Sequence, residues 1–135
     1  MTQQSRIYVA GHRGMVGSAV CRELQRQGFQ NVFGRTRQEV DLLDAVAVRK
    51  LYQETKPEFV FVAAALAGGI LANDQLPADF IYENLQVQNN VIYGAYEAGV
   101  KKLLFFGSSC VYPRQAPQPM KEEHLLTGPL EPTNQ

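Results

Sequence analysis

The chain lacks three features that would each point to a class of protein: tryptophan, more than two cysteines, and an excess of charge of either sign. Among its 135 residues, 13 Lys and Arg balance 13 Asp and Glu. Proteins that bind nucleic acid or anionic membranes usually carry a basic excess, so the balance argues against both partners. Two distant cysteines form no disulfide framework. Any anion that the chain binds must therefore be held by a local arrangement of residues.

Long apolar runs and a secretory pattern are also missing. The longest nearly uncharged stretch, Phe59–Asn73, is shorter than the roughly 20 apolar residues that cross a bilayer. The first residues, MTQQSRIYVAG, show neither the basic start nor the apolar middle and cleavage site of a signal peptide. We therefore expect no membrane partner, and the reducing cytoplasm as the location.

Short runs rich in β-branched and aromatic residues alternate with helical patterns. The predicted strands are Arg6–Ala10, Val32–Arg35, Phe59–Ala63 and Lys102–Gly107, and the predicted helices are Met15–Gln27, Asp44–Thr55 and Pro77–Gly99. This alternation predicts the α/β class, with a doubly wound parallel sheet of Rossmann type and about four strands. In the usual strand order 3-2-1-4 the last strand would be an unpaired apolar edge, so we expect the sheet to be incomplete.

Each predicted helix carries an apolar stripe that would face the sheet. Asp44 is the expected N-cap of the second helix, and Gly99 closes the third, which could be broken. The side chains expected to be buried are Val16, Ala19, Val20 and Leu24 in the first helix, Val46, Val48 and Leu51 in the second, and Phe80, Ile81, Leu85, Val91, Ile92 and Ala95 in the third.

A glycine-rich turn joins the first strand to the first helix. Gly11 would allow the tight turn, Gly14 would let a pyrophosphate approach bare backbone, and Gly17 would let the helix pack on the strand. Met15 and Val16 open a helix whose free N–H groups attract anions. This placement predicts dinucleotide binding; a purely structural glycine turn is the alternative.

The end of the second strand indicates which dinucleotide would bind. An acidic residue there accepts the ribose 2′-hydroxyl, whereas a basic residue holds a 2′-phosphate. The sequence has Arg35 and Arg37 there with no acid before Glu39, and Arg13 in the glycine turn adds a cation. The pattern favours NADP. One arginine would suffice to hold the 2′-phosphate, and Arg37 is the one more easily spared. The alternative is that both arginines face solvent in a loop.

Two more segments lie at the same predicted edge of the sheet. Asp41 and Leu42 could contact the adenine, although helix capping in the region of Asp41 and Asp44 explains an acid there equally well. Gly68–Gly69 would form a mobile or tightly turned loop. The third strand ends on small residues that would let a coenzyme lie across the sheet, or that close helix packing would select: Ala63, Ala64 and Ala65.

The segment Gly-Ser-Ser-Cys-Val-Tyr-Pro follows the fourth strand, where loops often carry catalytic groups. Cys110 is a candidate for such a group. The alternative for Cys110 is an unreactive buried thiol. Cys21, on the first helix, is expected in the core.

Several motifs resemble the extended short-chain dehydrogenase/reductases that act on nucleotide sugars: the glycines at 11, 14 and 17, Ala-Ala-Ala with Gly-Gly-Ile, Asn84, and Ser-Ser-Cys-Val-Tyr-Pro. Within that family, Gly-His-Arg-Gly-Met-Val-Gly-Ser, Arg-Thr-Arg and Leu-Glu-Pro-Thr-Asn are similar to NADPH-dependent epimerase/reductases of GDP-4-keto-6-deoxy-D-mannose. The resemblance runs the length of the chain and covers only the N-terminal part of such an enzyme.

The resemblance implies roles and partners. Ser108 would be the serine of a Ser-Tyr-Lys triad that hydrogen-bonds the C4 carbonyl while NADPH delivers hydride, and Cys110 would be an acid/base for epimerisation. The family's second acid/base is a histidine, and neither His12 nor His124 matches its place. A homodimer is implied, formed by a four-helix bundle to which Pro77–Gly99 would contribute. Without its partner helix, the chain is expected to aggregate or to pair with a complementing fragment.

The resemblance also implies a domain organisation. Residues 1–112 would be the N-terminal part of the NADP-binding Rossmann domain, and residues 113–135 a loop segment leading toward the catalytic helix and substrate domain. The triad's Tyr-x-x-x-Lys is absent, so we expect the chain alone to be inactive. Two alternatives remain. A non-catalytic NADP-binding module would not need Ser108 and Cys110, and another nucleotide-sugar epimerase or dehydratase would favour an acid at the end of the second strand.

Overall fold

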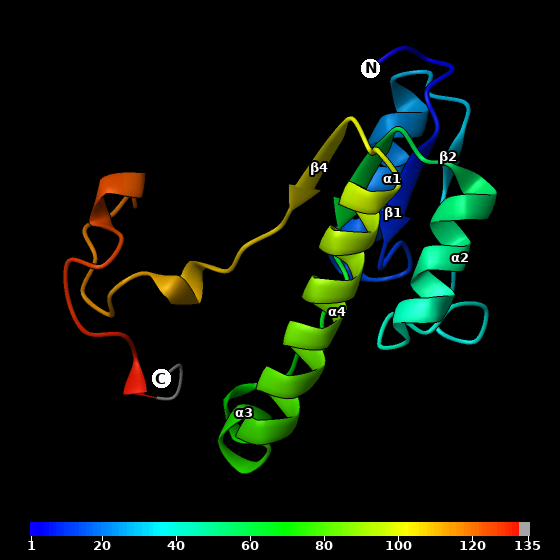
Figure 1. Ribbon diagram of the computed structural model, residues 1–135. Coiled ribbons are helices and arrows are strands. Elements are labelled where there is room, and N and C mark those ends of the chain that lie inside the picture. The colour runs from blue at the N-terminus through cyan, green and yellow to red at the C-terminus, as the bar shows by residue number, and fades with distance from the viewer. Residues whose placement is uncertain (133–135) are drawn as a thin grey trace. The chain divides into compact units, whose positions relative to one another are not determined.

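A computed structural model describes residues 1–132, which form two compact units (Figure 1). The first unit comprises residues 1–66 and 81–106 and holds the sheet. The second comprises residues 67–80 and 107 onward and includes the short 3-10 helices Ser109–Val111 and Glu122–His124. Thr133 and Asn134 of the Leu-Glu-Pro-Thr-Asn motif lie outside the described residues, as does the end of the predicted 113–135 segment. No helix in residues 1–132 combines the length and apolar character needed to cross a membrane.

The sheet is parallel and four-stranded, as predicted. Its strands are β1 (Ile7–Ala10), β2 (Val32–Phe33), β3 (Phe59–Val62) and β4 (Lys102–Phe105), in the order β2-β1-β3-β4. The predicted order 3-2-1-4 is therefore wrong. Residues 34–44 form turns and no strand beyond β2, and β3 pairs instead along the other edge of β1. β4 lies at the edge of the sheet as expected, with much of its apolar side-chain surface exposed.

Within residues 1–132 the chain forms four α-helices: α1 (Met15–Arg26), α2 (Ala45–Thr55), α3 (Ile70–Gln75) and α4 (Pro77–Glu97). Asp44 is the N-cap of α2 as predicted, because its carboxylate accepts hydrogen bonds from the N–H groups of Val46 and Ala47 at 2.8 and 3.2 Å. α4 is continuous over Pro77–Glu97, without the break that the sequence left open. Gly68 and Gly69 lie outside any helix or strand, as expected for a loop, and the sequence did not predict the short helix α3 that follows them.

Alternate residues of the strands face two separate clusters, as the twofold period of a strand requires. On one face Tyr8 and Ala10 pack with Val60 and Val62 against α2 and α4, and on the other Ile7 and Val9 pack against Leu24 of α1. Helices thus cover both faces of the sheet (Figure 1). Burial raises the pKa of the Tyr8 hydroxyl to about 12 and also raises that of the Tyr52 hydroxyl.

Several helix residues predicted to be buried are exposed. α1 contacts the sheet through Gly17 and Leu24, and this rotation leaves Val16 and Ala19 in solvent. α4 approaches α2 closely at Gly94, where a Cβ atom would lie 3.0 Å from the Tyr52 ring. The apolar stripe of α4 extends beyond the part of the helix that contacts α2, so apolar side chains outside that contact are exposed. The predicted core residues that are exposed on α2 and α4 are Val46, Ile81, Leu85 and Ile92.

Replacing Tyr52 tests the link between α2 and α4. The buried Tyr52 hydroxyl donates a hydrogen bond to the Val91 carbonyl at 3.0 Å. We expect Tyr52→Phe to lower the free energy of unfolding by about 1 kcal/mol, because the ring stays and the buried bond is lost. Tyr82→Phe, on an exposed part of α4, should change it by less than about 0.5 kcal/mol. Urea unfolding followed by circular dichroism measures both, and equal effects would contradict this account.

Candidate functional site

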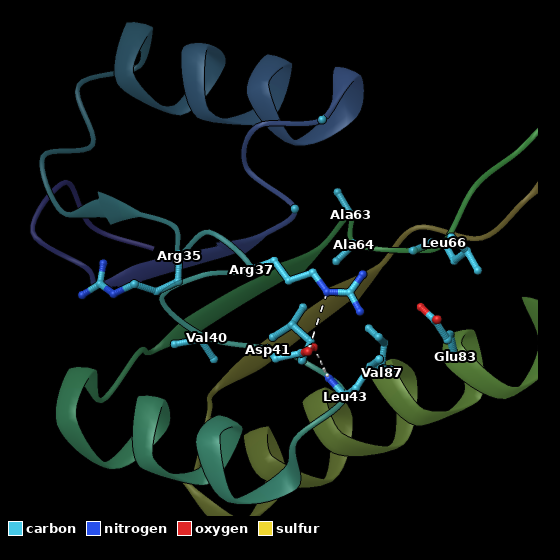
Figure 2. A pocket seen from close by; sticks show the side chains of 14 residues that line it. Arg35, Arg37, Val40, Asp41, Leu43, Ala63, Ala64, Leu66, Glu83 and Val87 are labelled. Atoms are coloured by element: carbon cyan, nitrogen blue, oxygen red, sulfur yellow. Dashed lines mark hydrogen bonds and ion pairs between the residues drawn. The ribbon is translucent and has the colours of Figure 1, made fainter. Parts of the chain in front are cut away.

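A pocket of about 310 Å³ opens at the carboxyl edge of the sheet, where the chain leaves β1 and β3 (Figure 2). From β1 the chain continues to β2 on one side, while β3 and β4 lie on the other. Such a switch in direction is where open α/β sheets bind ligands. The lining residues are Gly11, Gly14, Arg35, Arg37, Val40, Asp41, Leu42, Leu43, Ala63, Ala64, Ala65, Leu66, Glu83 and Val87.

The glycine turn packs directly against the end of β3. Gly11 has a φ of +79°, and a Cβ atom there would lie 2.5 Å from the Ala63 carbonyl oxygen. A Cβ atom on Gly17 would overlap the Gly11 carbonyl. Only glycine fits at these two positions, as expected for a tight turn and close packing. The two glycines hold the turn in place, and Gly14 remains at the wall of the pocket.

The start of α1 leaves backbone donors without a side-chain cap. Gly14 is the N-cap and has no side chain to accept the N–H groups of the first turn. Of the predicted coenzyme contacts, Gly11 and Gly14 line the pocket, whereas Arg13, Met15, Val16 and Gly17 do not. Any role of Met15 and Val16 would therefore rest on their N–H groups.

The two arginines after β2 differ in what they contact. Arg35 lies over the Phe33 ring, 5.6 Å from its centroid, and donates to the Gly34 carbonyl at 3.0 Å. Arg37 pairs through Nε with Asp41 Oδ2 at 3.6 Å. Both arginines line the pocket, and Figure 2 shows the Arg37 guanidinium beside Asp41 and the Arg35 guanidinium pointing to the opposite side. The geometry therefore favours Arg37 over Arg35 as the cation that faces a ligand, opposite to the preference from sequence.

The first acid after β2 is held in a turn. The Glu39 carboxylate accepts hydrogen bonds from the Thr36 N–H at 2.7 Å and the Thr36 hydroxyl at 2.8 Å. The bond from the Thr36 backbone, above all, lowers the pKa of the Glu39 carboxyl. Glu39 is not among the pocket residues. The acid closest in sequence to β2 therefore serves the local backbone.

Asp41 lines the pocket, and the cap of α2 is Asp44. One Asp41 oxygen accepts from the Leu43 N–H at 3.0 Å, which closes a short turn. The helix cap expected in this region is therefore Asp44 and not Asp41. Sequence reasoning missed five lining residues: Val40, Leu43, Leu66, Glu83 and Val87. Two signals could have found three of them, because Glu83 and Val87 lie four apart on one face of α4 and Leu66 follows the alanine run.

Ser108 and Cys110 belong to the second unit and are both exposed. The Ser108 hydroxyl oxygen accepts a hydrogen bond from the Cys110 N–H at 3.1 Å, which caps the short 3-10 helix. The alternative of a buried Cys110 thiol is therefore wrong. Cys21 packs beside Leu24, and burial raises the pKa of its thiol. Within residues 1–132, no group of three or more His, Cys, Asp and Glu side chains could hold a metal ion.

Residues 7–135 match the NAD dependent epimerase/dehydratase family. The chain is 57% identical over 135 residues to a putative GDP-L-fucose synthase 2 of Arabidopsis thaliana. It is 50% identical over 132 residues to the GDP-L-fucose synthase of Escherichia coli. These matches cover 100% and 98% of this chain, which spans about 41% of the length of either relative.

Two solved structures from Campylobacter jejuni are also similar. A GDP-D-glycero-L-gluco-heptose synthase with NADPH has a TM-score of 0.90 and 50% identity over 98% of this chain and 39% of that one. MlghC, a GDP-mannoheptose C4 reductase with NADP bound, has a TM-score of 0.91 and 50% identity over 98% of this chain and 42% of that one.

The packing of the glycine turn can be tested by adding one methyl group. Gly17→Ala should lower the free energy of unfolding by about 1–3 kcal/mol, because the new Cβ must displace the Gly11 carbonyl. Gly69→Ala is the matched control: its φ is −76° and a Cβ there meets nothing within 4 Å. That control should change stability by less than about 0.5 kcal/mol. Thermal unfolding measures both, and a neutral Gly17→Ala would contradict the close packing.

Proposed function

This chain belongs to the NAD dependent epimerase/dehydratase family, and we propose that it is the coenzyme-binding part of a GDP-L-fucose synthase. Such an enzyme epimerises and reduces GDP-4-keto-6-deoxy-D-mannose with NADPH. The observation that carries the proposal is the pocket in which bare glycine backbone faces the arginine-bearing segment after β2. The identity of 50 to 57% with named GDP-L-fucose synthases supports the choice of sugar.

The residues around the pocket fit NADP. Gly14 presents backbone where a pyrophosphate would lie, and the uncapped first turn of α1 adds N–H donors and a partial positive charge. Arg37 would hold the 2′-phosphate, with Asp41 and Leu42 beside the adenine. The small side chains of residues 63–65 leave room along the strand ends. When bound, NADPH supplies the hydride for the keto carbon.

Ser108 and Cys110 would carry the chain's own chemistry. Because the Ser108 oxygen accepts the Cys110 N–H, its hydroxyl hydrogen is free to donate to a substrate carbonyl oxygen. The exposed Cys110 thiol could take up and return a proton at a carbon beside that carbonyl. The exposed apolar side chains along α4 support the homodimer implied by the resemblance: Ile81, Tyr82, Leu85, Ile92, Tyr93 and Tyr96. The cytoplasmic location stays a prediction.

A second candidate is reduction without epimerisation. MlghC, described as a C4 reductase, is as similar to this chain as the E. coli GDP-L-fucose synthase is. Cys110 separates the two functions, because reduction alone needs no acid/base at the carbons beside the carbonyl. A non-catalytic NADP-binding module is the remaining alternative, and it would bind NADPH without any reaction of a keto sugar.

The coenzyme is tested first. The full chain should bind NADPH more tightly than NADH, as measured by nicotinamide fluorescence titration. Arg37→Gln should weaken NADPH binding about 10- to 100-fold and leave NADH binding nearly unchanged, because one charge-assisted phosphate contact is lost. Arg35→Gln should have a smaller effect. Arg49→Gln, which removes an ion pair to Glu97 outside the pocket, is the control. A preference for NADH would overturn the proposal in favour of an NAD-dependent epimerase.

Cys110 is tested in a complete enzyme. A chimera joins residues 1–135 to the remainder of the E. coli relative and is given GDP-4-keto-6-deoxy-D-mannose in deuterium oxide. Cys110→Ser should slow deuterium uptake beside the carbonyl by about 10²- to 10⁴-fold, whereas the control Cys21→Ser should not. Mass spectrometry measures the uptake. Full exchange in Cys110→Ser would remove Cys110 from the epimerisation, and reduction with no exchange in the parent chimera would favour the C4 reductase.

A further inference from the structure

One polar residue of α4 reaches the segment that follows β2, far away in sequence. The Asn90 side-chain amide donates hydrogen bonds to the carbonyl oxygens of Leu42 and Leu43, at 2.9 and 3.0 Å. Both leucines line the pocket, whereas Asn90 does not. Two donors on one amide fix two consecutive peptide groups, so Asn90 sets the position of this wall from behind.

The held segment leads directly to Arg37. The Leu43 N–H donates to one oxygen of Asp41, and the other Asp41 oxygen pairs with Arg37 Nε (Figure 2). The Arg37 side chain is 66% exposed, and its distance to Asp41 is 3.6 Å. Exposed ion pairs of this kind contribute little by themselves. The direction of Arg37 therefore depends on how firmly the backbone at residues 41–43 is held.

We propose that Asn90 is a positioning residue for coenzyme selection: by holding residues 42 and 43 it keeps Asp41, and through it Arg37, aimed at the 2′-phosphate of NADP. The inference rests on the proposed binding of NADP. Asn90 is not needed to link α2 to α4, because the Tyr52 hydroxyl already joins these helices through its hydrogen bond to the Val91 carbonyl. Asn90 acts instead at the wall that bears the charged pair.

The test compares two neighbouring asparagines by the ratio of the dissociation constants for NADH and NADPH. Asn90→Ala should lower this ratio three- to tenfold, because Arg37 loses its fixed partner. Asn89→Ala, at an exposed position one residue earlier, should leave it unchanged. NADH lacks the 2′-phosphate but shares the rest of the contacts, so a general loss of folding lowers both affinities and not their ratio. Asn90→Leu keeps the side-chain volume without the N–H donors, and serves if Asn90→Ala does not fold.

A double variant identifies the route. In the Arg37→Gln background, Asn90→Ala should no longer change the ratio, because the residue through which Asn90 acts is gone. If Asn90→Ala lowers both affinities equally, or still changes the ratio in that background, the positioning role is overturned. If the unsubstituted chain prefers NADPH and both Asn90 variants keep that preference, this inference alone is overturned. If the unsubstituted chain shows no preference for NADPH over NADH, the NADP assignment is overturned as well.

Discussion

The close approach of the glycine turn to the end of β3 is the constraint on which the pocket depends. Gly11 lies against the Ala63 carbonyl, and Gly17 lies against Gly11. These contacts bring the start of α1 to the point where the sheet changes direction. A side chain at either position would push the helix N-terminus away from the strand ends. The pocket thus exists because two methyl groups are missing, and its chemical character comes from the segments around it.

The helix α4 fastens the other walls of this pocket. Asn84 bonds the Leu66 backbone twice, accepting from its N–H at 2.8 Å and donating to its carbonyl at 3.0 Å, and thereby holds the segment after β3. Asn90 holds the segment that precedes α2. One helix therefore positions two loops that come from different strands. Such side-chain bonds to backbone satisfy polar groups that no strand or helix pairs.

Sequence reasoning succeeded where the signal is local. The glycine turn and the Asp44 cap depend on residues near one another in the chain. The alternation of short strand and helix patterns is likewise read from local segments and predicts the parallel sheet; the structure confirms all three. It failed where the outcome depends on distant packing. The order of the strands depends on which edge of β1 is free, and the exposure of Val46 depends on how α2 is rotated against Tyr8. The difference between Arg35 and Arg37 depends on the Phe33 ring and on Asp41, which no spacing rule encodes.

The charge of the pocket also follows from how its acids are used. Glu39 is bonded to Thr36, and Asp41 is divided between the Leu43 N–H and Arg37. An acid that accepts the ribose 2′-hydroxyl of NAD must point a carboxylate oxygen at the coenzyme. Glu39 does not line the pocket, and Asp41 is paired with Arg37. Since local turns hold both carboxylates, the cationic side chain after β2 is left to meet the ligand. The proposed preference for NADP therefore arises from the turns that engage the acids as much as from the arginines.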